Sequence, residues 1–133
     1  DISEWDMSNA TSLEWMFYEA RSFNQELTKW NTSKVTSTLC MFAYAISFNG
    51  DVSTWDTSKV TTMYRMFTGA KSFNGDISKW NTSQVTSMHC MFKNAKLFNQ
   101  DISSWNFTIV TNHNGMLEDA ESFDERHAPD FNL

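Results

Sequence analysis

Residues 76–100 read Asp-Ile-Ser-Lys-Trp-Asn-Thr-Ser-Gln-Val-Thr-Ser-Met-His-Cys-Met-Phe-Lys-Asn-Ala-Lys-Leu-Phe-Asn-Gln, and the rest of the chain up to residue 123 aligns with this stretch without a gap. The tryptophan recurs every 25 residues, at Trp5, Trp30, Trp55, Trp80 and Trp105. A fixed period of this size is the sequence signature of a stacked repeat protein. We therefore predict five coils within residues 1–123, starting near residues 1, 26, 51, 76 and 101, and a closing segment over residues 124–133.

The composition sets limits on the class of protein. A chain of 133 residues with 41% hydrophobic residues has enough apolar material for the core of one domain. Sixteen acidic and ten basic residues give a net charge of -6, which argues against nucleic acid as a partner. No run approaches the roughly 20 apolar residues of a membrane-spanning helix, and no signal peptide is present. Because the chain starts at Asp1, we expect a processed chain or a part of a longer array.

Large and small side chains recur at fixed positions of the repeat. One aliphatic residue, one methionine, one alanine and two phenylalanines recur at fixed positions of each coil, except that Leu117 replaces one phenylalanine in the fifth coil; in the fourth coil they are Ile77, Met91, Ala95, Phe92 and Phe98. Columns of this kind interdigitate between coils and bury surface that a single repeat could not bury alone. We expect them to form the core.

Two short elements are predicted within each coil. Val60, Met63 and Phe67 are spaced as on one face of a helix, with Ser58 as a suitable N-cap. Residues 76–78 alternate polar and apolar side chains, as in a half-buried strand. We therefore expect an α/β repeat solenoid, a stack of five coils that each combine a short parallel strand with a short helix.

Stacked strands would align polar side chains on an exposed face. We expect an interaction ladder made of one acidic and one hydroxyl residue per coil: Asp1, Glu26, Asp51, Asp76, Asp101, Ser3, Thr28, Ser53, Ser78 and Ser103. Carboxylate oxygens also suit Ca²⁺, but each coil offers a single carboxylate, and no aspartate-rich loop with a turn glycine is present. A solvated acidic face is therefore the main expectation.

The repeat also carries a family resemblance. Its pattern, Trp-Asp/Asn-Thr-Ser-x-Val-Thr-x-Met-x-x-Met-Phe-x-x-Ala-x-x-Phe-Asn-x-Asp-Ile-Ser, resembles the repeat of bacterial and mycoplasma surface proteins, often grouped with the BspA-like leucine-rich repeats. The resemblance covers residues 1 to about 123. It implies a leucine-rich-repeat-like solenoid, secreted or displayed on a cell surface, that acts in adhesion or assembly. One departure is that Asn74 precedes the strand residue Ile77, whereas the leucine-rich signature places its Asn after the strand leucines.

Four sequons of the type N-x-S/T are candidates for N-glycosylation, at Asn9, Asn31, Asn81 and Asn106. Three of them directly follow the repeated tryptophan, where we expect an exposed turn. Asp6 and Asp56 occupy the same position in the other coils, and an Asx-turn accepts either residue type. Both a structural role and glycosylation in a secretory pathway therefore remain open.

The inventory for catalysis is poor. The three histidines share no repeated partner, and four glycines in total make a phosphate-binding loop improbable. Cys40 and Cys90 lie two coils apart, too far for a disulfide, and are expected to be buried free thiols. We predict no enzyme, no cofactor and no metal site.

Three functions remain. The first is an extracellular or cell-surface module for adhesion that binds a protein or a glycan through the exposed ladders. The second is a structural subunit that stacks end to end on other copies of itself, since the first coil would present an open end and Phe131 and Leu133 would cover the last. The third is ice binding, which is the weakest of the three because it needs a flat face and Thr61 and its equivalents lie within the predicted helix. It would use two regular threonine columns: Thr11, Thr36, Thr61, Thr86, Thr111 and Thr32, Thr57, Thr82.

Overall fold

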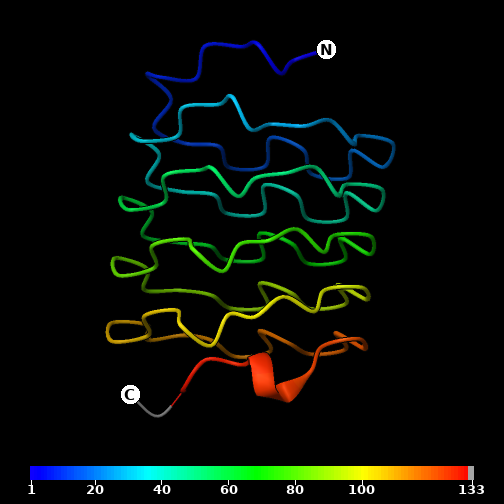
Figure 1. The fold of residues 1–133 in the computed structure, drawn as a ribbon, viewed down its shortest axis with the longest axis vertical. Coiled ribbons are helices and arrows are strands. Elements are labelled where there is room, and N and C mark those ends of the chain that lie inside the picture. The colour runs from blue at the N-terminus through cyan, green and yellow to red at the C-terminus, as the bar shows by residue number, and fades with distance from the viewer. Residues whose placement is uncertain (132–133) are drawn as a thin grey trace.

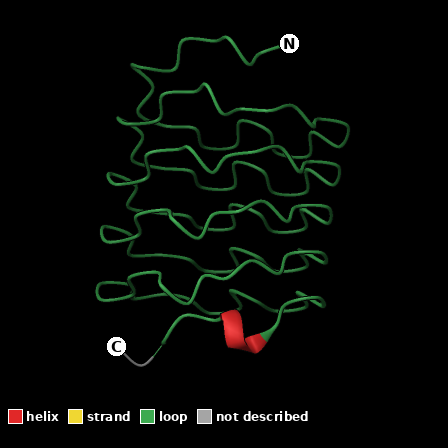
Figure 2. Ribbon diagram, viewed as in Figure 1, coloured by secondary structure: helices red, strands yellow, loops and turns green. Residues whose placement is uncertain are grey.

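The computed structural model describes residues 1–131 and shows a chain wound into successive coils that stack along the long axis of the molecule (Figure 1). The N-terminus lies at one end of the stack and the last described residues lie at the other. Figure 2 shows the coils as loops and turns, followed by one 3₁₀ helix, η1, over Glu125–His127. Within residues 1–131 no helix is long and apolar enough to cross a membrane.

The predicted α/β solenoid of leucine-rich-repeat-like coils, each with a strand and a helix, is wrong. Within the described part of the chain, consecutive coils share only isolated parallel bridges, which join Ser12, Ser37, Thr62, Ser87 and Asn112 in sequence. None of these bridges lies where a strand was predicted. The coils are built from consecutive tight turns, whose remaining backbone groups bond to the coils above and below.

The predicted helix around residues 60–70 is a run of such turns. The N–H of Met66 donates to the carbonyl of Met63, three residues back, at 3.1 Å, whereas an α-helix would bond four residues back. The N–H of Phe67 leaves the coil and donates to Met91 of the next coil at 2.9 Å. Consecutive turns return side chains to one face at spacings of three and four, so the apolar pattern alone does not separate them from a helix. Ser58 consequently caps no helix.

The predicted strand at residues 76–78 is also a turn. The N–H of Trp80 donates to the carbonyl of Ile77 at 3.2 Å, and the N–H of Ser78 donates to Asp76 Oδ1 at 3.0 Å. This second bond is that of an Asx-turn, in which a side-chain oxygen substitutes for a backbone acceptor. The polar–apolar–polar alternation therefore reflects a capped turn around a buried Ile77, which has 0% exposure.

Backbone hydrogen bonds between coils hold the stack together. From the second coil to the third, four alternate N–H groups donate to four alternate carbonyls at 2.7–3.2 Å: Thr38 to Thr62, Cys40 to Tyr64, Phe42 to Met66 and Tyr44 to Thr68. This geometry needs left-handed backbone at two positions per coil, even where the residue is not glycine; φ is 53° at Cys40 and 60° at Tyr44. Such conformations cost roughly 1–2 kcal/mol each, which the bonds on either side offset.

Aromatic rings fill the core in continuous stacks. Phe67 lies parallel to Phe73 of its own coil, with ring centroids 4.0 Å apart, and to Phe42 of the preceding coil at 5.4 Å. The tryptophans form a third stack, in which Trp80 lies 6.2 Å from Trp55. Each buried indole N–H also donates to a carbonyl of the preceding coil, as Trp80 does to Val52 at 3.1 Å. The repeated tryptophan therefore joins neighbouring coils by both packing and hydrogen bonding.

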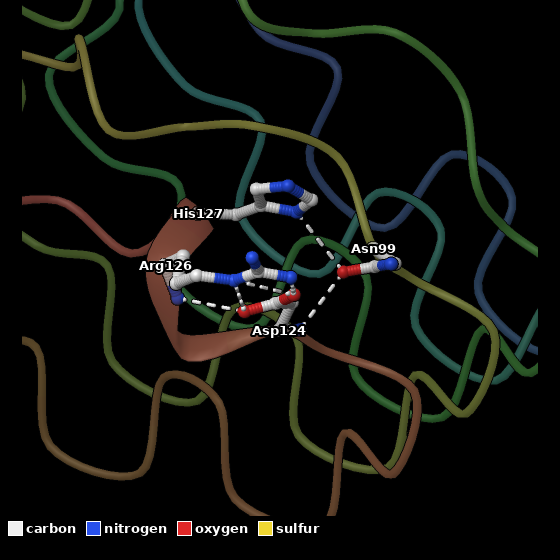
Figure 3. A network of polar contacts seen from close by, with 4 residues as sticks. All are labelled: Asn99, Asp124, Arg126 and His127. Carbon is white, nitrogen blue, oxygen red and sulfur yellow. Dashed lines mark hydrogen bonds and ion pairs between the residues drawn. The ribbon is translucent and has the colours of Figure 1, made fainter.

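An asparagine ladder runs along the outside of the stack through Asn24, Asn49, Asn74 and Asn99, each side-chain oxygen accepting the backbone N–H of the next member at 2.8 Å. The last step goes to Asp124, whose N–H donates to Asn99 Oδ1 at 2.8 Å (Figure 3). The Asp124 carboxylate accepts hydrogen bonds from Arg126, and His127 Nδ1 lies 3.1 Å from Asn99 Oδ1. The residues around η1 therefore close the ladder.

Phe131 packs on the last coil. Its ring stacks on His113, with centroids 4.7 Å apart, and meets Phe107 edge-on at 5.4 Å. Leu133, the other residue expected to cover this end, lies outside the described residues.

Candidate functional site

The predicted acidic ladder is a series of capped turns on the surface. Its carboxylates are exposed, and those of Asp51, Asp76 and Asp101 each accept a backbone N–H from the serine two residues on, at 2.9–3.0 Å. The hydrogen bonds from these serines hold the pKa of each aspartate below its usual range. Asp1 caps Ser3 in the same way, whereas Glu26 accepts the N–H of Asp51 in the next coil.

The aspartates of the ladder bond within their own turns, and Glu26 bonds to the next coil. In the described part of the chain, no group of three or more His, Cys, Asp or Glu side chains could hold a metal ion. The hydroxyl members of the ladder, Ser3, Thr28, Ser53, Ser78 and Ser103, lie beside the carboxylates and are half-buried or exposed. All of the ladder residues except Glu26 and Thr28 therefore have a structural role in the capped turns.

The sequon asparagines are exposed and also cap turns. Asn31, Asn81 and Asn106 accept the N–H of the residue two positions on, at 2.8–3.0 Å. Asn9 is exposed as well, and its Oδ1 accepts a hydrogen bond from Lys34 at 3.2 Å. The side-chain amide nitrogens of Asn31, Asn81 and Asn106 have no bond to the described part of the chain, so nothing there blocks their modification.

The two threonine columns differ. Thr32, Thr57 and Thr82 are at most 3% exposed, and the Thr57 hydroxyl donates to the carbonyl of Asn81 at 2.9 Å. The column from Thr11 to Thr111 is exposed, but its hydroxyls from Thr36 onward donate to the carbonyl of the preceding threonine at 3.1–3.3 Å. One exposed column remains, and its donors are already used within the stack.

An aromatic cluster of three residues lies on the surface near the first coils. Trp15, Tyr18 and Tyr44 are 52%, 41% and 38% exposed, in contrast to the buried phenylalanine and tryptophan stacks. The rings touch edge to face: Trp15 and Tyr18 centroids lie 5.0 Å apart, and those of Tyr18 and Tyr44 lie 5.9 Å apart. Burial and the neighbouring Glu19 raise the pKa of Tyr18, so its hydroxyl stays neutral and can donate a hydrogen bond.

A shallow groove continues from this cluster across the coils. This Tyr44 groove has a volume of ≈ 380 Å³ and is lined by Arg21, Lys71 and Lys96 together with Tyr44 and Gly69. None of the described residues that line it is acidic. A groove that combines an aromatic ring with several cations can bind a ligand that offers both an apolar face and negative charge.

Sequence reasoning missed the aromatic cluster because its residues do not repeat. Tyr44 occupies a coil position that holds Glu19 in the first coil and Gly69 in the third. Tyr18 aligns with Ala43, and Trp15 with Cys40. The cluster would have been found by a search for large aromatic residues at repeat positions where the residue type changes from coil to coil.

The stacked coils and their fixed period define the chain as a repeat protein, and comparison with known families gives its family. The family model described as "Mycoplasma protein of unknown function, DUF285" matches residues 1–57 and 50–132. These matches cover almost the whole chain, so the protein belongs to the DUF285 family. No curated protein and no solved structure shows a significant match to the chain. The mycoplasma-type resemblance is therefore confirmed at the level of this family, and the BspA-like assignment stays a prediction.

Proposed function

We propose that this chain is an extracellular or cell-surface interaction module that binds a glycan or a protein in adhesion. The observation that supports the proposal is the exposed aromatic cluster of Trp15, Tyr18 and Tyr44. Contiguous exposed apolar surface on a folded protein marks an interaction site, and tryptophan and tyrosine contribute most of the contact energy at such sites.

The core does not need these three rings. The buried stacks already contain one tryptophan and two phenylalanines in each of the central coils, with exposed fractions of 5% or less. The cluster residues instead contact one another on the surface. The exposed sequons at Asn31, Asn81 and Asn106 agree with an extracellular location, because glycosylation would occur on a secretory route.

The proposal is tested by binding of the purified chain to glycan arrays and to extracellular-matrix proteins. Trp15→Ala should reduce binding, because it removes the most exposed ring of the cluster. Trp5→Ala is the matched control, since Trp5 is also 52% exposed in the same coil but has no aromatic contact within the described residues. An equal effect of the two substitutions, or no binding by the unaltered chain, contradicts the proposal.

A second candidate function, a structural subunit that stacks end to end, is favoured by the backbone edges of the outer coils. In the first coil the carbonyls of Ser12, Glu14, Met16 and Tyr18 accept no hydrogen bond from the described chain, although the matching carbonyls of later coils do. In the last coil the N–H groups of His113, Gly115, Leu117 and Asp119 likewise find no acceptor there. The two edges have complementary donors and acceptors in the same register, so each fits a further coil.

Sedimentation velocity tests this second candidate. Removing the segment from Asp124 onward, or replacing Phe131 by Ala, uncovers the last coil and should increase self-association if another copy supplies the further coil. Phe131→Ala keeps the Asp124–Asn99 bond and is therefore the milder change. If both variants keep the sedimentation coefficient expected for the mass of one chain, end-to-end stacking of copies is excluded.

A further inference from the structure

The charge of the Tyr44 groove is opposite to that of the protein as a whole. The chain has a net charge of -6, yet three of its ten basic residues, Arg21, Lys71 and Lys96, line this one groove. No acidic residue is among its described lining residues. A local excess of positive charge on an acidic protein favours an anionic ligand at that place.

Two of the three cations, Arg21 and Lys71, can bind a ligand without breaking an ion pair to a described residue. Lys96 forms an ion pair with Glu121 at 3.1 Å, and this pair is partly exposed. Arg21 and Lys71 form no ion pair with any described residue. An exposed ion pair such as that of Lys96 contributes little to stability, so a ligand can compete for it as well.

The cations form a row along the stack. Lys71 and Lys96 occupy the same position in consecutive coils, and Arg21 occupies that position two coils before Lys71. Coils joined by parallel bridges are spaced about 4.8 Å apart, so the row presents charges at multiples of that distance. A small anion would meet only one or two of them, whereas a linear polymer with repeated negative charges meets the whole row.

The aromatic wall of the groove has a fixed position. Gly69 has φ of +67°, and a Cβ at this residue would lie 2.5 Å from Cδ1 of Tyr44. The Tyr44 ring therefore rests directly against the backbone of the next coil, with Tyr18 edge-on to it at 5.9 Å and 82°. A ring held in this way offers a preformed surface for the apolar face of a sugar.

We propose that the Tyr44 groove binds a linear acidic polysaccharide, with Arg21, Lys71 and Lys96 contacting its carboxylate or sulfate groups and Tyr44 contacting a sugar ring. This inference rests on the proposed interaction function and specifies its ligand class. A polysaccharide fits better than an acidic peptide because the exposed aromatic cluster meets the cation row at Tyr44, and exposed aromatic rings suit the apolar faces of sugars.

The test uses the whole chain and four immobilised probes: heparin, polygalacturonate, neutral dextran and poly-glutamate. Binding is measured by biolayer interferometry at low and at physiological salt. We expect the chain to bind heparin or polygalacturonate, more weakly at higher salt, and to bind dextran and poly-glutamate much less. Preference for heparin indicates that sulfate is the recognised group, and preference for polygalacturonate indicates carboxylate.

Two double variants locate the binding. Arg21→Gln with Lys71→Gln should weaken polysaccharide binding by about tenfold, because two exposed charge contacts are lost. Lys34→Gln with Lys59→Gln removes the same net charge away from the groove and should leave binding nearly unchanged. Circular dichroism confirms that each variant is folded. An equal loss in both double variants, or tighter binding of poly-glutamate than of either polysaccharide, overturns the inference.

The inference and the proposed function can fail separately. Binding to neutral glycans or to matrix proteins that depends on Trp15 but not on Arg21 and Lys71 overturns the acidic-polysaccharide assignment and leaves the interaction function standing. Absence of binding to all glycans and matrix proteins overturns both.

Discussion

Replacing Trp80 by Phe should destabilise the stack, because Trp80 joins two coils in two different ways. Its ring is 4% exposed and lies between the rings of Trp55 and Trp105, with centroid distances of 6.2 and 6.4 Å. Its indole N–H donates to the carbonyl of Val52 in the preceding coil at 3.1 Å. Phenylalanine keeps part of the ring packing and removes the donor.

The expected magnitude has two parts. The lost hydrogen bond contributes about 1 kcal/mol, near the middle of the usual range, because the Val52 carbonyl still accepts the N–H of Trp55 at 3.2 Å. The smaller ring adds about 1–2 kcal/mol through lost burial and the space that it leaves. The sum of about 2–3 kcal/mol corresponds to a fall in Tm of roughly 10 °C for a chain of this size.

Urea and thermal unfolding followed by circular dichroism measure this loss. Trp5→Phe is the control, because Trp5 is 52% exposed and its indole has no hydrogen-bond partner among the described residues. The control should change the free energy of unfolding by no more than about 0.5 kcal/mol. If Trp80→Phe unfolds at the same urea concentration as the control, the repeated indole bonds do not hold neighbouring coils together.

Three further predictions concern a turn, the capped aspartates and the sequons. Gly69→Ala should lower stability by about 1–2 kcal/mol in urea unfolding, because alanine is strained at φ +67° and its Cβ would clash with Tyr44; unchanged stability would contradict the left-handed turn. The pKa of Asp76 is lowered in the folded state, so the ionised carboxylate stabilises the fold. This contribution to stability is complete above the unfolded pKa of about 3.9 and is lost as pH falls through the folded pKa. Tm should therefore drop on acidification below about pH 4, and less steeply in Asp76→Asn; parallel curves would refute this. In a glycosylating host, Asn81 and Asn106 should not both carry a glycan, because they lie in adjacent, directly hydrogen-bonded coils and two glycans would collide. Intact mass spectrometry checks this, and a dominant species with glycans on both residues would refute it.

The period and the core could be predicted from sequence because they depend on repeated side chains. Ile77, Met91 and Phe98 each have 0% exposure, as their apolar character indicates, and their columns are only partly buried in the outer coils, as at Ile2 and Met16. The same period aligns the asparagines of the ladder through Asn74, whose side chains bond to the backbone of the adjoining coil on the exterior of the stack.

The backbone conformation could not be predicted in the same way. A helix and a run of consecutive turns place apolar side chains on the same face, but they differ in where the N–H groups donate and in backbone angles. Residues such as Cys40 and Arg65 adopt positive φ, at 53° and 51°, although neither type favours that region. These angles result from hydrogen bonds to the neighbouring coils, and the sequence of a single repeat does not show those bonds. The aromatic cluster escaped for a different reason, because Trp15, Tyr18 and Tyr44 stand at coil positions where the other coils hold other residue types.

The direction of the hydrogen bonds between coils determines how the molecule responds to force. The bonds from one coil to the next run along the stack, and the two ends of the described chain lie at opposite ends of it (Figure 1). A force that pulls these ends apart acts along the hydrogen bonds and separates one coil from its neighbour at a time. Each released coil of 25 residues can extend to about 80–90 Å, against about 5 Å of stack height. Under tension the protein would therefore lengthen in repeated steps and dissipate energy at each one.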